Sequence, residues 1–341
     1  MRYLILVICS FLIFVSCSFW SNIKKKTKIP INISKFYEDL VKSSQHPFWG
    51  GPIKVVESGT LVSFQLTGSK DFIIVDKKSG NFKKLYPNPP DSIGGMVYRY
   101  NPVSFVFANS SGFSYLKNEN QLIHIEELGD LENPVLLKGE VLSNPSKILY
   151  ISNKSMISFW YGSSLKGNSS KGGLFFTDLE RNSTNRIISD DEFESIADLV
   201  VEDNKIIILE KYRPVIRVFD FTGKELQTID LPKSNYLKYQ KLVRPTGFQN
   251  LTSEEKVTFL EDYCLDLTQK GDTTAYLHQI KSTKNNSLVD RYLLTLFSKG
   301  TLQEKLLEFT PLNFSSNGDV YLINKTDSGQ FLIQKTLNQI F

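Results

Sequence analysis

The residues most able to do chemistry are few in this sequence and lie far apart. Its three histidines are His46, His124 and His278, and Cys264 is the only cysteine beyond residue 17. No GxSxG, HExxH or GxxxxGK[ST] pattern occurs, so the chain lacks a nucleophile elbow, a metalloprotease helix and a phosphate-binding loop. A zinc site needs three or four imidazole or thiolate ligands brought together. We therefore predict no catalytic residue, no cofactor and no metal.

Aromatic side chains near expected turns are better candidates for a binding role. Trp49, Trp160 and Tyr161 lie in aromatic segments that contain glycine, and such rings can stack on glycans or peptides. Residues 266–288 are polar, and we expect them to form a long loop whose Lys270 and His278 also meet the ligand. These five residues are the candidate ligand-binding set. Packing between sheets is the alternative role for the aromatic residues.

The first 17 residues carry the most specific pattern in the chain. Arg2 precedes an apolar run over residues 3–15, which is too short to cross a hydrocarbon core of about 30 Å and is typical of a secretory signal. The run ends in Phe-Val-Ser-Cys at residues 14–17, which resembles the bacterial lipobox. The resemblance implies that residues 1–16 are removed and that Cys17 is acylated. A cleaved secretory peptide with an incidental cysteine is the alternative.

A lipid on Cys17 would attach the protein to a membrane of the bacterial cell envelope, with the outer membrane favoured. Residues 17–33 contain four lysines within five positions and no apolar periodicity, so we expect a solvated tether. The whole chain has 40 basic and 36 acidic residues, a net charge of +4 over 341 residues. This balance argues against nucleic acid as a partner.

A polar or glycine-containing turn followed by a short apolar run recurs along the body of the chain. The turns end at residues 59, 112, 154, 204, 256 and 318, so their spacings are 53, 42, 50, 52 and 62 residues. One four-stranded blade of a β-propeller takes roughly 40–50 residues. The pattern therefore predicts six repeated β-units, with the expected loop at 266–288 inside the longest interval.

A second recurring element is an apolar strand, a polar turn and an alternating strand. It occurs over residues 72–85, over 216–229 with Asp220 and Gly223, and over 294–306 with Gly300, whereas residues 174–187 keep an aspartate without the glycine. Aspartate caps its own turn, and glycine accepts a positive φ. These hairpins resemble the outer strand pair of six-bladed TolB-like and NHL-type propellers.

We therefore predict an all-β fold, a six-bladed β-propeller with a short N-terminal helix at residues 34–44. The domain covers residues 34–341 and follows a signal peptide at 1–16 and a lipidated tether at 17–33. A pair of β-sandwiches is the alternative, because it would also produce alternating strands with glycine turns. The regular spacing favours the propeller.

Two functions are compatible with this architecture. The favoured one is non-enzymatic: a lipid-anchored propeller whose loops bind an envelope or extracellular protein or glycan. The alternative is a metal-dependent hydrolase or lyase with its site in the central channel. That function requires three or more of Glu57, Glu202, Asp203, Glu254 and the three histidines to converge within metal-bonding distance.

Replacing Cys17 by serine is expected to release the protein from the membrane fraction, because serine has no thiol to acylate. Fractionation and immunoblotting of cells that express the wild type or Cys17→Ser measure this release. Cys9→Ser is the matched control and should stay with the membrane. An unchanged membrane-bound share for Cys17→Ser contradicts the lipobox interpretation.

Overall fold

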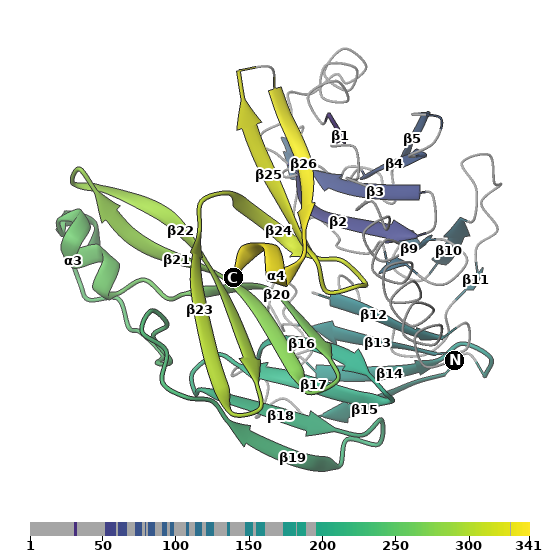
Figure 1. The fold of residues 1–341 in the computed structure, drawn as a ribbon. Helices are drawn as coiled ribbons and strands as arrows, with labels where there is room; N and C mark the ends of the chain where they lie inside the picture. The colour runs from purple at the N-terminus through teal and green to yellow at the C-terminus, as the bar shows by residue number, and fades with distance from the viewer. Residues whose placement is uncertain are drawn as a thin grey trace, which may run out of the picture.

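Figure 1 shows the computed structural model of the chain. From residue 196 to the C-terminus, the structure describes every residue except 328. Before that, it describes the strands given below between Ile31 and Ile188, together with residues 79, 81 and 179–181. Within these residues the regular secondary structure is almost entirely β-strand, so the all-β prediction is confirmed. The helix expected at 34–44, the signal segment and all but two residues of the tether lie outside the described residues. No helix in the described part is long and apolar enough to cross a bilayer.

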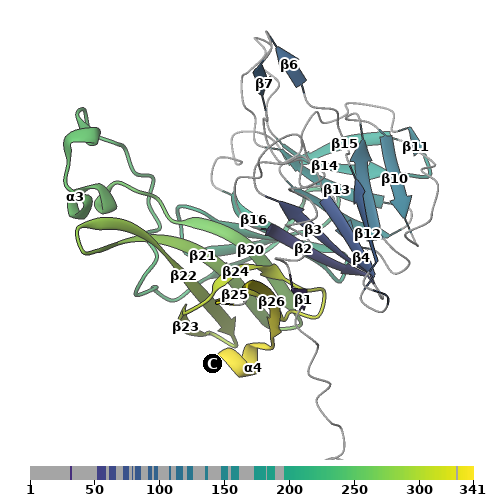
Figure 2. The ribbon, with the colours of Figure 1, turned by 90° about the horizontal axis from the view of Figure 1, so that it is seen from above.

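The described part of the chain contains six four-stranded antiparallel sheets, and five of them are built from consecutive strands. The first contains β2 (Pro52–Ser58), β3 (Leu61–Leu66), β4 (Phe72–Asp76) and β5 (Phe82–Leu85). The second contains β8 (Phe107–Ala108), β9 (Phe113–Lys117), β10 (Gln121–Ile125) and β11 (Val135–Leu136). Between them, β6 (Asp91–Ile93) and β7 (Met96–Tyr98) form a separate hairpin that projects from the sheets in Figure 2.

The next three sheets repeat the same order. The third sheet contains β12 (Lys147–Ser152), β13 (Ser155–Trp160), β14 (Gly173–Asp178) and β15 (Ser183–Ile188). The fourth contains β16 (Ile196–Glu202), β17 (Lys205–Glu210), β18 (Val215–Phe219) and β19 (Glu225–Asp230). The fifth contains β20 (Tyr263–Lys270), β21 (Thr273–Lys284), β22 (Ser287–Ser298) and β23 (Thr301–Leu307). All four predicted hairpins are confirmed as the third and fourth strands of their sheets. In the turn after β18, Asp220 accepts hydrogen bonds from the backbone N–H groups of Thr222 and Lys224, at 2.8 and 3.0 Å.

The sixth sheet combines the two ends of the described chain. It contains β24 (Thr310–Phe314), β25 (Val320–Thr326), β26 (Gly329–Lys335) and, on the outer edge, β1 (Ile31–Asn32). Ile31 pairs with Leu332 and Asn32 with Phe331, and Figure 2 shows β1 beside β26. Two residues that we assigned to the tether therefore take part in a sheet.

The first strands of successive sheets contact one another. These contacts join β2 to β8, β8 to β12, β12 to β16, β16 to β20, β20 to β24 and β24 to β2. Two polar side chains reinforce them. Asn313 in β24 accepts a hydrogen bond from Val55 N and donates one to Val55 O, at 2.8 and 2.7 Å, while Asp266 in β20 accepts one from Phe314 N at 2.7 Å.

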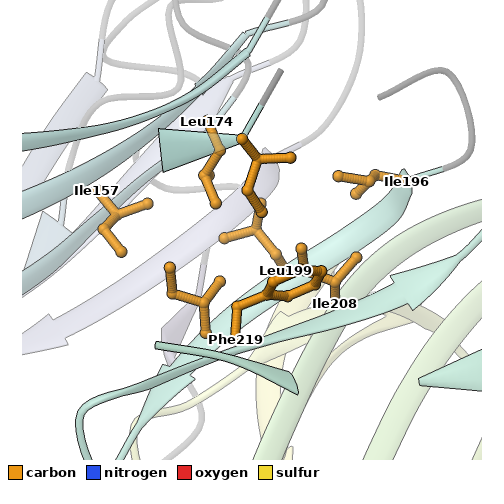
Figure 3. Packing of buried hydrophobic residues seen from close by; sticks show 8 residues of the cluster. Ile157, Leu174, Ile196, Leu199, Ile208 and Phe219 are labelled. Atoms are coloured by element: carbon orange, nitrogen blue, oxygen red, sulfur yellow. The ribbon is translucent and has the colours of Figure 1, made fainter. Parts of the chain in front are cut away.

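Apolar side chains fill the spaces between neighbouring sheets, as Figure 3 shows for the cluster around Ile157, Leu199 and Phe219. Strand β17 contributes to two such clusters. Ile206 and Ile208 pack toward the preceding sheet, whereas Ile207 and Leu209 pack toward the following one. Side chains alternate across a strand, so a continuous apolar run indicates a sheet that is buried on both faces.

Two local predictions are wrong. Residues 266–288 do not form a loop: they contain most of β20, all of β21 and the start of β22. Residues 254–256 do not form a turn before a strand, because they lie in α3 (Ser253–Thr258), which follows a one-turn helix, η2 (Phe248–Asn250). The long connection of the fifth unit is instead residues 231–262, between β19 and β20. A short C-terminal helix, α4 (Leu337–Ile340), follows the last strand.

Gly223 provides a test of packing between sheets. It has a φ of +86°, and a Cβ there would lie 1.9 Å from the carbonyl oxygen of Ile187 in the preceding sheet. Gly300 has a similar φ of +78°, but a Cβ added there would meet no other atom within 4 Å. We expect Gly300→Ala to cost about 1 kcal/mol of unfolding free energy from the φ alone. Gly223→Ala should cost about 3 kcal/mol or more, because two sheets must move apart.

Denaturant unfolding of the two variants and the wild type measures these costs. Equal losses for Gly223→Ala and Gly300→Ala would contradict the contact between the turn after β18 and Ile187.

Candidate ligand-binding site

A cavity of about 490 Å³ lies at one end of the fourth and fifth sheets. Its position follows from the antiparallel order: β17 ends where β16 begins, and the connection from β19 leads to the start of β20 at the same end. The cavity is lined by the starts of β16 and β20, the turn after β17, the connection between β19 and β20, and β21. The lining residues are Ala197, Lys211, Tyr212, Leu237, Lys238, Tyr239, Gln240, Lys241, Glu261, Asp262, Tyr263, Cys264 and His278.

The connection of residues 231–262 forms one wall of this cavity and is fixed at several points. The carboxylate of Asp262 accepts a hydrogen bond from Lys238 N at 2.8 Å, and Lys238 Nζ donates to Val257 O at 2.7 Å. Ser234 Oγ accepts from the backbone N–H groups of Tyr236 and Leu237. These bonds hold Leu237–Lys241 beside β20, and the distal part runs outward to α3 beside the β21–β22 hairpin (Figure 1).

His278 and the half-buried Tyr239 form the base of the cavity, and Tyr276 packs behind them without lining it. Tyr276 is fully buried in β21, its ring lies edge-on to that of His278 at 5.5 Å, and its hydroxyl lies 3.5 Å from that of Tyr239. His278 is 6% exposed, and its Nδ1 has no hydrogen-bond partner. An unmade hydrogen bond at a buried polar atom is costly, about 1–3 kcal/mol. The base therefore has an unsatisfied capacity for hydrogen bonding.

Burial also fixes the protonation of these groups. It lowers the pKa of His278 to about 3 and raises the pKa of Tyr239 to about 12. Burial likewise raises the pKa of Tyr276 well above its usual range. All three side chains are therefore neutral near pH 7, when a neutral imidazole and two hydroxyls can each donate and accept hydrogen bonds.

Charged groups surround the opening. Lys211 Nζ lies 2.5 Å from Glu261 and 5.0 Å from the centre of the Tyr212 ring. Partial burial is the largest single influence and opposes ionisation of both charged groups, but hydrogen bonds and nearby opposite charges together outweigh it: the pKa of Lys211 is raised and that of Glu261 is lowered. Burial of the Asp262 carboxyl raises its pKa, although the hydrogen bond from Lys238 N acts in the opposite direction. The opening therefore presents ammonium and carboxylate groups side by side.

The structure separates the predicted ligand-binding residues. Trp49, Tyr161 and the lipidation site Cys17 lie outside the described residues, and Trp160 is placed by its backbone pairing with Gly173 in β14. His278 lines the large cavity, but Lys270 lies at the other end of β20, about 20 Å away at 3.3 Å per residue. There Lys270 is exposed, donates to Asn317 O at 3.4 Å and borders a second pocket of about 200 Å³.

The carboxylates required for a channel metal do not converge in the described part of the chain. Glu202 accepts a hydrogen bond from Gly271 N at 3.0 Å, while Glu254 belongs to α3. Across the described residues, no three histidine, cysteine, aspartate or glutamate side chains are grouped so that they could hold a metal ion.

Two cavity tyrosines that were not expected from the sequence are Tyr239 and Tyr263. A signal for this wall is visible in the sequence: residues 231–253 contain four basic residues and no acidic one, without strand-like alternation. Such a segment between two strand pairs marks a long connection, and long connections often carry binding residues.

Comparison with known proteins gives similarity in structure only. No protein-family model and no curated protein sequence matches the chain. A protein from Bacteroides fragilis described as exported is similar to it with a TM-score of 0.50 and 8% identity, over 85% of this chain and 92% of its own. At this identity the similarity extends to the fold alone.

Two further structures are more distant. A member of the DUF4221 family from Bacteroides vulgatus has a TM-score of 0.49 and 11% identity, with 86% of this chain and 94% of its own covered. The β-propeller domain of the Trilobed protease from Pyrococcus furiosus has a TM-score of 0.41 and 10% identity, with 86% and 97% covered.

Buried, neutral His278 is expected to make the stability of the fold sensitive to acid. Its pKa falls from 6.5 to about 3 on folding, so the unfolded chain binds the extra proton first. The stabilising contribution of neutral His278 is complete above pH 6.5 and is lost as the pH falls toward 3. Between pH 7 and 4.5 the wild type should lose about 2–3 kcal/mol more than His278→Gln, which has no imidazole to protonate.

Urea unfolding of both proteins at pH 7 and 4.5 measures this difference. Parallel losses in the wild type and His278→Gln would show that the imidazole is not shielded from water in the folded state.

Proposed function

We propose that this chain is a lipid-anchored, six-bladed β-propeller of the bacterial cell envelope. It binds a protein or glycan partner through the cavity at the end of its fourth and fifth sheets and performs no catalysis.

The contacts between first strands support the propeller. Each sheet touches the next through its first strand, and the contact between β24 and β2 connects the last sheet to the first. The pairing of β1 with β26 completes the sixth sheet with a strand from the other end of the described chain. A ring of four-stranded sheets closed in this way is the architecture of a propeller.

The N-terminal sequence supports the location in the envelope. Residues 1–17 combine a basic residue, a short apolar run and a cysteine in a lipobox-like ending. The Bacteroides fragilis protein of similar fold is itself described as exported. Partners would then be molecules outside the cytoplasm.

The cavity carries the proposal of binding. Its volume of about 490 Å³ lies within the range of roughly 300–1,000 Å³ that is usual for ligand sites. Its walls combine aromatic rings with charged groups, and its base contains the incompletely hydrogen-bonded His278. The described lining has one thiol, Cys264, whose Sγ donates to the backbone oxygen of Asp266 at 3.8 Å. This arrangement suits recognition rather than nucleophilic attack.

Photo-cross-linking in living cells tests this function. p-Benzoylphenylalanine at Tyr263, which is 65% exposed at the cavity, should form an ultraviolet-dependent adduct with the partner, detected by mass. The same residue at Leu226, which is 48% exposed on the edge strand β19, should not. Adducts of equal yield at both positions, or at neither, would contradict binding at the cavity.

A further inference from the structure

The chemical character of the cavity indicates its ligand. Among its thirteen lining residues, Ala197 and Leu237 are the only aliphatic ones, whereas three are tyrosines and six are charged or amide side chains. A peptide or lipid is usually anchored by an apolar side chain or tail in an apolar pocket. A sugar ring instead has apolar C–H faces and a polar periphery of hydroxyl groups. The lining matches this second pattern.

Tyr263 supplies a flat surface for such a ring. It lies at the start of β20, and 65% of it is exposed although it borders the cavity. Its backbone is held by pairing with Gln279 in β21, so the exposed ring is attached to a regular sheet. An aromatic ring on a backbone held in a sheet is suited to stacking because the backbone loses little conformational freedom on binding.

The other polar groups are placed to receive hydroxyls. Lys211 and Glu261 put an ammonium donor next to a carboxylate acceptor at the opening. At the base, buried His278 has an unpartnered Nδ1, and the hydroxyl of Tyr239 has a long contact of 3.5 Å with that of the fully buried Tyr276 behind it. Hydroxyl groups both donate and accept, so they can complement this mixture directly or through bound water.

We infer that the cavity binds a saccharide, with one sugar ring stacked on Tyr263 and its hydroxyls on Lys211, Glu261 and the polar base. This inference rests on the proposed function and specifies the class of ligand for the same site. A peptide is the alternative outcome that the experiment must separate.

The test uses the purified mature chain on two arrays. One carries mono- to hexasaccharides of hexoses, N-acetylhexosamines and uronic acids, and the other carries random peptides. We expect binding to at least one saccharide. Titration calorimetry with that saccharide should show that Tyr263→Ala weakens binding about tenfold or more, whereas Tyr263→Phe, which retains the ring, stays close to the wild type.

Tyr236→Ala is the matched control, since Tyr236 is a 41% exposed tyrosine in the connection of residues 231–262 that does not line the cavity. Its affinity should equal that of the wild type. Circular dichroism checks that each variant is folded. If Tyr263→Ala is unstable, the two single variants Lys211→Met and Glu261→Gln test the site instead. Both should weaken binding, because each removes one charged partner of a hydroxyl.

The inference is overturned if only peptides bind, if no saccharide binds, or if neither Tyr263→Ala nor the charge variants weaken saccharide binding. If cross-links at position 263 still form in cells, those results overturn the saccharide assignment alone. If those cross-links also fail, the proposed binding function fails with it.

Discussion

The contact between β24 and β2 is the interaction on which the rest of the structure depends. Asn313 is 5% exposed, and its amide bonds both backbone groups of Val55 as well as Phe314 O. It therefore joins a strand near the C-terminus to one near the beginning of the described chain. Asp266 makes the corresponding link one sheet earlier, to Phe314 N. Sheet edges carry unpaired backbone groups, and buried ones must be satisfied. Side chains from the neighbouring first strand provide that satisfaction here.

This mode of joining leaves the faces of the sheets to apolar packing. Strand β21 illustrates it: Tyr276 packs in the cluster on one side, and Ala275 and Leu277 pack in the cluster on the other. A sheet that is buried on both faces has no room there for polar function. Functional groups must then collect at the ends of strands and in connections. The cavity occupies such an end, where Ala197, Tyr263 and the turn after β17 meet.

The sequence predicted the repeated hairpins because their turns are local. Asp220 bonds its own turn, and Gly223 and Gly300 have positive φ values, so the residue types reveal the conformation. It failed at residues 266–288 because β21 and β22 extend beyond their neighbours: β21 pairs with β20 only up to Gln279, whereas it pairs with β22 as far as Lys284. Residues 281–284 of the projecting part are all polar and half-buried or exposed, whereas Ile280 at its base remains buried. Helix α3 had a readable signal, the capping box of Thr252 and Glu255.

The candidate site could be predicted only in part, because its residues come from segments that are brought together by the order of the sheets. His278 was selected from the sequence, but its neighbour Cys264 is 14 residues away in the chain and opposite it in β20. Lys211 and Glu261 are 50 positions apart and meet because both flank the same end of adjacent sheets. Lys270 was grouped with His278 on the assumption of a loop, and a strand places the two at opposite ends. A strand converts separation in sequence into distance at a fixed rate, whereas a loop does not. Once β20 is recognised as a strand, Lys270 and His278 lie about 20 Å apart. The residues that share a cavity with His278 come instead from the starts of β16 and β20, the turn after β17 and the connection of residues 231–262.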